Sequence, residues 1–190
     1  MEAIILAAGR GTRMAPLTDT MPKPMLSVLG KNLIEWKLEA LPNGITKIIL
    51  VVGYKKEVIQ DYFGSSWKGI PIIYIEQIIL DGTGGAIALC EQYIGSKALI
   101  LMGDDIYNKE DIAKLATYDN AILVLDEGED GLKKKGQVVE KEGKLVGLNE
   151  GDVQTGTPSS LINTGAYCIS KKYFSYPKIK VSESEYGLPQ

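Results

Sequence analysis

The feature that most constrains the fold is a regular alternation of short apolar runs with stretches of helical character. Predicted strands occupy the apolar, β-branched runs at Ala3–Ala8, Lys47–Val52, Ile70–Ile75, Ala98–Met102 and Ala121–Leu125. Predicted helices occupy the segments between most of them, at Leu33–Leu41, Glu57–Phe63, Gly84–Tyr93 and Glu110–Thr117. Because the strands are continuously apolar, we expect a mainly parallel sheet that is buried on both faces between helices. The pattern predicts a doubly wound α/β fold in three layers.

The pattern changes further along the chain. Two short segments, Gln137–Glu140 and Lys144–Leu148, flank the turn Glu142-Gly143 and predict a β-hairpin. Another strand is predicted over Ala166–Ile169. We expect these segments to form a small antiparallel lobe beside the sheet. A single domain is expected, because 190 residues lie inside the usual single-domain range.

Composition removes several classes of function. The chain contains no histidine, which excludes serine–histidine–aspartate hydrolysis, HExxH zinc chemistry and histidine-linked intermediates within it. The net charge is −3, from 21 basic and 24 acidic residues without a long run of either sign, so no nucleic-acid partner is expected. A small phosphorylated ligand needs only a few well-placed cations and stays compatible with this charge.

Cysteine usage and hydropathy indicate the compartment. Cys90 and Cys168 lie far apart in apolar stretches, which predicts buried free thiols and a cytoplasmic protein. The first apolar run lacks a basic flank and leads directly into a glycine-rich loop, so we expect no signal peptide. No segment is long enough to span a membrane, and no membrane partner is expected.

The loop after the first predicted strand reads LAAGRGTRMAPLT and is followed by PKPML. Ligands of open α/β sheets gather at the carboxyl ends of strands, and this loop leaves such an end. Gly9 and Gly11 let backbone N–H groups approach an anion closely, and Thr12 adds a hydroxyl donor. Arg13 supplies a planar fork for phosphate oxygens, and Lys23 supplies a compact positive charge. The loop is therefore predicted to bind a polyphosphate.

Two familiar phosphate loops do not fit this segment. A Walker A loop needs Gly-Lys followed by Ser or Thr, and a dinucleotide fingerprint needs a third glycine where Met14 stands. The fingerprint also needs an acidic residue at the end of the second strand, which here ends Val52-Gly53-Tyr54. From the glycines alone, a solvated surface turn remains an alternative of equal weight.

A second glycine-rich segment follows the third predicted strand. Gln77 ends that strand, and Gly82-Thr83-Gly84 opens the next helix. The Gln77 amide offers a donor and an acceptor, which suits the edge of a nucleotide base, and the glycines allow a ring to lie close to the backbone. A tight strand-to-helix turn with a solvated Gln77 is the structural alternative.

Two carboxylates follow the fourth predicted strand, in the sequence Gly103-Asp104-Asp105. Oxygen ligands beside a polyphosphate loop suit Mg²⁺, so this pair is a candidate metal site. Asp105 is expected to cap the following turn. Taken by itself, such an acidic pair is also typical of a helix cap.

The loop motif resembles the signature of the sugar-1-phosphate nucleotidylyltransferases, and weaker resemblance extends over nearly the whole chain. The resemblance implies a glycosyltransferase-A-like, Rossmann-like fold. It also implies that the loop amides and arginine hold the NTP phosphates, that Lys23 stabilises the reacting phosphates and that Asp104 holds the catalytic Mg²⁺. The nucleotide-binding residues implied in this way, with the base-binding segment included, are Leu6, Ala8, Gly9, Gly11, Thr12, Arg13, Gln77, Gly82 and Thr83.

The same resemblance places an acceptor site. Gly136, Glu150 and the segment Asn163-Thr164-Gly165 match positions where family members bind the sugar. A carboxylate such as Glu150 accepts hydrogen bonds from hydroxyls well. Each of these positions has a turn-forming alternative of comparable weight.

Part of the family pattern is absent from residues 1–190. Family members supply a second metal-binding Asp or Asn further along the chain, and Glu185-Tyr186 resembles only the start of that motif. We therefore expect a nucleotidylyltransferase core that lacks the C-terminal part of the family domain.

The reaction implied is transfer of NMP from an NTP to a sugar 1-phosphate, with pyrophosphate as the second product. A CTP-dependent transferase for a phosphorylated alcohol such as phosphocholine shares the loop and is the close alternative. A non-catalytic, regulatory nucleotide-binding module is the alternative from another class. The sequence specifies neither the base and sugar nor the oligomeric state.

Overall fold

The computed structural model describes residues 1–132, 136–149, 159–182 and 185–187. Its main sheet has the strand order β10-β9-β11-β7-β1-β4-β6-β5, and β8 pairs with β11 beside this path. The central strands are parallel and comprise β7 (Lys97–Met102), β1 (Glu2–Ala7), β4 (Lys47–Val52) and β6 (Ile70–Glu76). The strands β1, β4 and β7 are almost entirely buried, which confirms the predicted mainly parallel sheet.

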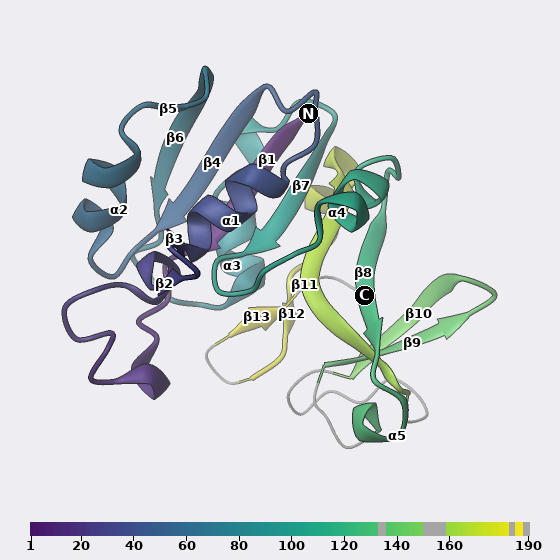
Figure 1. Cartoon of the computed structure of the whole chain (residues 1–190). Coiled ribbons are helices and arrows are strands. Elements are labelled where there is room, and N and C mark those ends of the chain that lie inside the picture. Colours follow the sequence, from purple (N-terminus) through teal and green to yellow (C-terminus); the bar gives the residue numbers. More distant parts are fainter. Residues whose placement is uncertain (133–135, 150–158, 183–184, 188–190) are drawn as a thin grey trace.

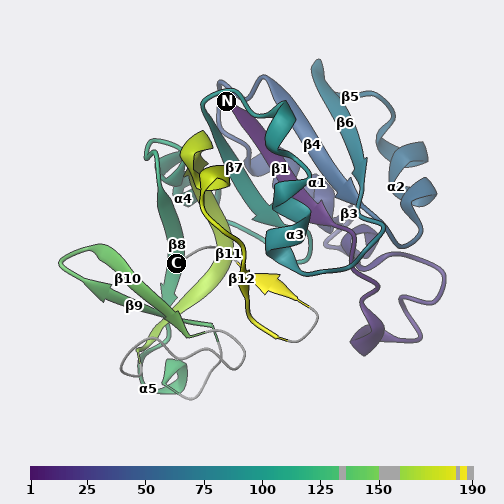
Figure 2. The same ribbon diagram turned by 180° about the vertical axis from the view of Figure 1, so that it is seen from behind.

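Helices cover both faces of this sheet (Figures 1 and 2). On one face, α1 (Leu33–Ala40), α2 (Lys56–Phe63) and α4 (Lys109–Leu115) form a core cluster with alternate residues of the central strands. On the other face, α3 (Thr83–Ala88) and the segment around η3 (Glu91–Tyr93) form a second cluster with the remaining strand residues. The three predicted layers are therefore confirmed.

The second half of the chain adds antiparallel strands. The long strand β11 (Leu161–Ser170) runs antiparallel to β7, and the hairpin of β9 (Gln137–Lys141) and β10 (Lys144–Asn149) projects from the sheet (Figure 1). Both the hairpin and the predicted strand through β11 are confirmed. The segment Ala121–Leu125 was predicted as a buried strand of the mainly parallel sheet. The structure has it as β8 (Ala121–Asp126), which pairs antiparallel with β11 and is partly exposed.

The remaining differences from the sequence are local. The predicted helix Gly84–Tyr93 is shorter as α3 and continues as η3, consistent with the low helix propensity of its glycines. Short elements in the loops were not predicted: η1 (Thr12–Met14), η2 (Lys23–Met25), β2 (Ser27–Val28), β3 (Lys31–Asn32), β5 (Ser66–Trp67), α5 (Gly128–Gly131), η4 (Lys171–Ser175), β12 (Ile179–Lys180) and β13 (Tyr186–Gly187). Within the described residues, no helix has the length and apolar character needed to cross a bilayer.

Candidate active site

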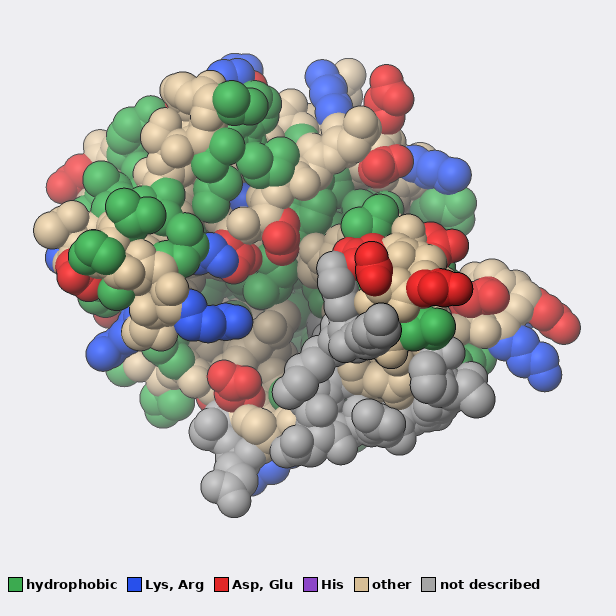
Figure 3. Space-filling model, turned by 60° about the horizontal axis from the view of Figure 1, so that its bottom comes forward, with side chains coloured by type: hydrophobic (Ala, Val, Ile, Leu, Met, Phe, Trp, Pro, Cys, Tyr) green, Lys and Arg blue, Asp and Glu red, His purple; other side chains and the backbone are tan. Residues whose placement is uncertain are grey.

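A cavity of about 440 Å³ lies at the carboxyl ends of β1, β6 and β7. Of the residues predicted to bind nucleotide, catalyse or bind metal, all except Ala8 line it, namely Leu6, Gly9, Gly11, Thr12, Arg13, Lys23, Gln77, Gly82, Thr83 and Asp104. Ala8 is buried beneath the loop. Figure 3 looks onto this face, where basic and acidic side chains surround a hollow. The sheet thus brings together loops that are up to about a hundred residues apart in sequence.

The loop after β1 is folded back on itself and packed against Lys23. Gly11 has a left-handed φ of 63°, and a Cβ there would lie 2.9 Å from the Lys23 Cβ. The Thr18 hydroxyl donates to the Gly11 carbonyl at 3.0 Å and anchors the far side of the loop. Gly9 has no atom within 4 Å of its missing Cβ, so its backbone faces open space. Gly11 is therefore required by the fold, whereas Gly9 leaves room for a ligand.

Lys23 and Asp104 meet in the cavity. The Lys23 Nζ donates to the Asp104 Oδ2 at 2.6 Å, and both side chains are partly exposed. Gly103 makes this meeting possible, because a Cβ at Gly103 would lie 2.3 Å from the Leu6 carbonyl oxygen. Arg13 is exposed beside them and forms no ion pair with any residue in the described ranges. Lys23, Arg13 and the glycine-rich loop therefore line the same cavity as the partly exposed Asp104 carboxylate.

Gln77 has the donor side of its amide already engaged. Its Nε2 donates to the Asp81 carboxylate at 3.1 Å and to the Gly82 carbonyl at 3.2 Å. The side chain is 6% exposed and lines the cavity, so the solvated turn considered above does not describe Gln77. The acceptor oxygen of the amide is the atom that these contacts leave for a ligand.

The glycines of α3 mainly serve packing. A Cβ at Gly84 would lie 2.2 Å from the Gly187 carbonyl oxygen, and a Cβ at Gly85 would lie 1.8 Å from the Asp81 carboxylate. The Tyr186 N–H donates to the Asp81 carbonyl at 2.7 Å. These close approaches bring the segment 185–187 against α3. The sequence predicted that the same glycines leave room for a nucleotide base, and it did not predict this packing.

This packing adds a residue that the sequence interpretation did not place in the site. Glu185 lines the cavity because the next two residues, Tyr186 and Gly187, pack against α3. Its match to a family motif was the available signal, because nothing local in sequence links it to the glycine-rich loop. Other lining residues outside the predicted set are Ala7, Arg10, Met14, Pro24, Leu80, Ala86, Met102 and Gly103.

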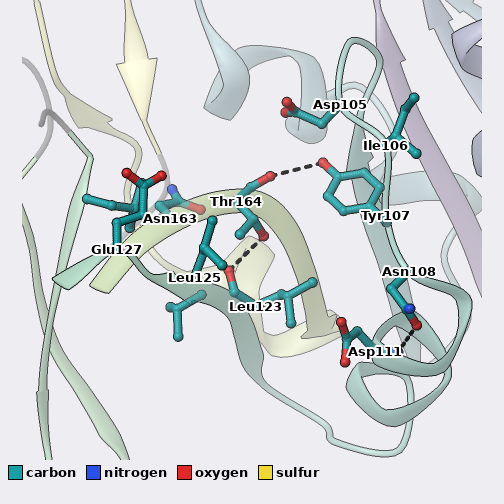
Figure 4. Close-up of a pocket in the computed structure, with 12 residues that line it drawn as sticks. Asp105, Ile106, Tyr107, Asn108, Asp111, Leu123, Leu125, Glu127, Asn163 and Thr164 are labelled. Atoms are coloured by element: carbon teal, nitrogen blue, oxygen red, sulfur yellow. Dashed lines mark hydrogen bonds between the residues drawn. The ribbon is translucent and has the colours of Figure 1, made fainter. Parts of the chain in front are cut away.

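A second cavity of about 410 Å³, between α4, β8 and β11, contains two of the predicted acceptor residues (Figure 4). Asn163 and Thr164 line it, and the Gly136 carbonyl accepts the Asn163 N–H at 2.8 Å. The Thr164 hydroxyl donates to the Leu123 carbonyl at 2.8 Å, and the Asn163 Oδ1 accepts from the Gly165 N–H at 2.8 Å. Asn163 and Thr164 thus lie within strand β11, at its register shift against β8, and not in the turn of the alternative interpretation.

Glu150 lies outside the described residues. Asp105 lines the second cavity, and the cap of α4 is Asn108, whose Oδ1 accepts from the Glu110 N–H at 2.7 Å and the Asp111 N–H at 3.3 Å. The prediction that Asp105 caps the following turn is wrong. The capping residue is Asn108, which lies directly before α4.

Carboxylates are sparse around Asp104. Among the described residues, no group of three or more His, Cys, Asp or Glu side chains is arranged to hold a metal ion. Mg²⁺ is commonly bound by one or two carboxylates together with substrate phosphates and waters. Asp104, next to the loop predicted to bind a polyphosphate and in the cavity that Glu185 also lines, fits that mode of binding.

Comparison with known proteins identifies the family. The family model described as Nucleotidyl transferase matches residues 2–189. The chain belongs to the nucleotidyl transferase family. Similar nucleotidyl transferases include the bifunctional protein GlmU of Methanococcus maripaludis strain C7, which is 37% identical over 177 residues. That match covers 92% of this chain and 41% of GlmU, so the chain spans about two fifths of the length of such relatives.

Other relatives agree with this family. The UTP–glucose-1-phosphate uridylyltransferase AglF of Haloferax volcanii is 33% identical over 181 residues, covering 92% of this chain and 74% of AglF. A structure from Bacillus anthracis described as a glucose-1-phosphate thymidylyltransferase, in complex with sucrose, has a TM-score of 0.78 at 26% identity, over 93% of this chain and 74% of that one. A UDP-glucose pyrophosphorylase complexed with UDP-glucose has a TM-score of 0.76 at 23% identity over 92% of this chain and 77% of that chain, and shows the shared fold.

Proposed function

We propose that this nucleotidyl transferase joins the nucleoside monophosphate of an NTP to a sugar 1-phosphate, releasing pyrophosphate and forming an NDP-sugar. The observation that carries the proposal is the meeting of the glycine-rich loop, Lys23 and Asp104 in one cavity. The names of AglF and of the Bacillus anthracis structure, both of which specify glucose 1-phosphate, support the acceptor class.

In the proposed reaction, an oxygen of the acceptor phosphate attacks the α-phosphorus of the NTP in line with the leaving pyrophosphate. Amides of the loop around Gly9 and the Arg13 guanidinium bind the β- and γ-phosphates, while Lys23 lies toward the reacting phosphates. No general base is needed, because a phosphate oxygen is already ionised at pH 7. A chain without histidine is suited to this chemistry.

Asp104 is the proposed Mg²⁺ ligand, in keeping with the metal use typical of the family. When bound, Mg²⁺ supplies charge neutralisation for the meeting of two anions. Asp104 is neutralised by Lys23 in this structure. A bound triphosphate gives the Lys23 ammonium a second anionic partner in the same cavity.

Gln77 is proposed to select the base. With Nε2 held by Asp81 and Gly82, its Oε1 accepts a hydrogen bond and therefore favours a base edge with a ring N–H. Uracil and thymine present such an N–H at N3 and guanine presents one at N1, whereas cytosine presents an acceptor at N3. The uridylyl- and thymidylyltransferase names of AglF and of the Bacillus anthracis structure favour the first two bases. We therefore propose UTP or dTTP as the nucleotide, and the acceptor at N3 of cytosine argues against the CTP-dependent alternative.

The acceptor is proposed to bind toward Gly136, Glu150, Asn163 and Thr164. The backbone bond between Gly136 and Asn163 brings two of these segments together. The second cavity adjoins the first at the Asp104–Asp105 turn, since Asp104 lines one and Asp105 lines the other. A phosphorylated sugar that spans this turn would place its phosphate near Lys23 in the first cavity and its hydroxyls in the second cavity.

A pyrophosphate-release assay tests the proposed function. Each NTP is incubated with Mg²⁺ and with either glucose 1-phosphate, N-acetylglucosamine 1-phosphate or phosphocholine, and pyrophosphate is measured. Release that depends on UTP or dTTP and on a sugar phosphate is expected, with strong loss in Arg13→Ala and no loss in Lys172→Ala on the distant η4. Release with CTP and phosphocholine alone would favour the alcohol-phosphate transferase. Nucleotide binding without release under any combination would favour the non-catalytic module.

A further inference from the structure

Lys37 on α1 is a fully buried lysine, with 0% of its surface exposed. Its Nζ donates to the Leu33 carbonyl oxygen at 3.0 Å and to the Asp105 carbonyl oxygen. These two acceptors lie in different parts of the chain, since Leu33 belongs to the same helix and Asp105 to the turn after β7. The ammonium therefore links α1 to that turn.

The turn held by Lys37 carries the proposed metal ligand. Asp104 precedes Asp105 and pairs with Lys23 at 2.6 Å, and the short helix η2 that carries Lys23 packs against α1. Asp104 lines the nucleotide cavity and Asp105 lines the second cavity, so the turn forms the wall between them. Lys37 is thus placed directly behind the residues on which the proposed reaction depends.

The charge of Lys37 is not explained by packing. Burial lowers the Lys37 pKa to about 8, while nearby Asp104 and Asp105 act to raise it. The side chain therefore remains mainly protonated at pH 7. Removing an ammonium from water is costly, and a methionine of similar volume would fill the same space without that cost. The two carbonyl oxygens that the ammonium binds, one of them in the turn of Asp104, give the buried group a structural partner at the site.

We propose that Lys37 is a positioning residue, whose ammonium holds the Asp105 carbonyl and so fixes the Asp104 carboxylate toward Lys23 and the nucleotide cavity. The inference rests on the proposed function. Lys37 touches no substrate in this account and acts only through the Gly103–Asp105 turn. Groups that orient a metal ligand from behind commonly change metal affinity or activity by about ten- to a hundredfold when removed.

A double-mutant cycle tests this role. The parent, Lys37→Met, Asp104→Asn and the double variant are titrated calorimetrically with UTP, with and without Mg²⁺, and each is melted thermally. Lys37→Met is expected to weaken Mg·UTP binding about tenfold and to leave metal-free UTP binding nearly unchanged. In the Asp104→Asn background, the Lys37→Met change is expected to have little further effect, because its route to the metal is already lost.

Lys97→Met is the matched control. The Lys97 Nζ also donates to two backbone carbonyls, those of Ala116 at 3.1 Å and Tyr118 at 2.9 Å, but from the opposite end of β7. This control is expected to bind Mg·UTP as the parent does. Lys37→Gln, which keeps a donor near the same place, is the second variant if Lys37→Met does not melt cooperatively, and it is expected to lose less affinity.

Other results of these titrations would overturn the inference. Unchanged Mg·UTP affinity in a folded Lys37 variant would show that the ammonium does not position Asp104. An equal loss in the Asp104→Asn background, or an equal loss without Mg²⁺, would show a general packing defect. A parent protein that binds no UTP, or binds it without regard to Mg²⁺, would instead overturn the proposed function itself, and the inference with it.

Discussion

The ion pair between Lys23 and Asp104 joins side chains that are 81 positions apart in sequence. Their exposed fractions are 30% and 37%, and exposed ion pairs contribute only about 0.2–1 kcal/mol to stability. The pair is therefore a small part of the folding free energy. Because both side chains line the cavity at the strand ends, we expect the pair to affect ligand binding more than stability.

Replacement of Asp104 by asparagine is expected to separate binding from stability. The amide is nearly isosteric, so the melting temperature should change little, but the metal site loses a negative charge. Mg·UTP binding should weaken on the order of tenfold or more, because even residues that only orient metal ligands have effects of this size. Calorimetric titration of UTP with and without Mg²⁺ measures the change.

Asp119→Asn is the control for that change. Asp119 forms the ion pair with Lys97 at 3.3 Å, is 81% exposed and lies at the other end of β7. It should leave the Mg²⁺ dependence unaltered. If Asp104→Asn also keeps the parent's Mg²⁺ dependence, Asp104 is not the ligand and Asp105 becomes the candidate.

Gln77→Ala is expected to reduce base selection. Removing the acceptor that faces the N3–H of uracil should weaken UTP binding by about tenfold relative to CTP, as for a lost buried hydrogen bond. Pyrophosphate affinity should stay the same, because the amide does not contact phosphates. Competition titrations with UTP, CTP and pyrophosphate measure this, with Gln92→Ala on η3 as control. An equal loss for all three ligands would indicate a folding defect.

Because Lys37 is buried, we expect the free energy of unfolding to depend on pH. Its pKa in the folded protein is about 8, below the ordinary value of 10.5, so the unfolded chain holds this proton more tightly. The resulting destabilisation is fully present below pH 8 and is relieved as pH rises toward 10.5. Lys37→Met should therefore be the more stable protein at pH 7, by up to about 3 kcal/mol, and should lose this advantage by pH 10.5. Urea unfolding of both proteins across this pH range measures the difference, and a constant gap would contradict the assignment.

Among the elements, the strands and helices of the parallel sheet were predictable. A short, continuously apolar run is buried most readily as a central strand that helices cover on both faces. The antiparallel pairing of β8 with β11 was not, since an apolar run specifies burial and leaves strand direction open. The packing role of the glycines in α3 was also not predicted. Their close contacts are with Asp81 and Gly187, and the contact with Gly187 is a long-range one that no local pattern encodes.

Gly9 and Gly103 give a matched test of the loop and of its support. A Cβ at Gly9 has no neighbour within 4 Å, whereas a Cβ at Gly103 would lie 2.3 Å from the Leu6 carbonyl oxygen. Gly103→Ala should destabilise the fold by about 1–3 kcal/mol through this clash. Gly9→Ala should leave stability within about 0.5 kcal/mol and weaken triphosphate binding, because the new methyl occupies space that a phosphate approaches.

Thermal melting and calorimetric titration of the two glycine variants distinguish these roles. A large loss of stability in Gly9→Ala would mean that the loop is built for packing. Parent-like UTP binding by a stable Gly9→Ala would remove this glycine from the phosphate site.

At the scale of the whole molecule, the fold gathers the site from distant segments. The loop after β1, the turn after β6 and the turn after β7 share one edge because their strands run parallel in one sheet, in the order β7-β1-β4-β6. The motifs identified each segment, and the topology was sufficient to predict that they meet. Lys37 and Glu185 were missed as site residues, because burial of a lysine and the return of a chain segment depend on tertiary contacts.

The central claim is that this assembled edge transfers a nucleotidyl group, and the fate of the phosphates tests it most directly. The protein is incubated with Mg²⁺, glucose 1-phosphate and UTP labelled at either the α- or the γ-phosphorus. The account predicts α-label in a UDP-sugar and γ-label in pyrophosphate, with both products strongly reduced in Lys23→Met. Transfer of γ-label to the sugar, or equal product formation by Lys23→Met, would contradict it.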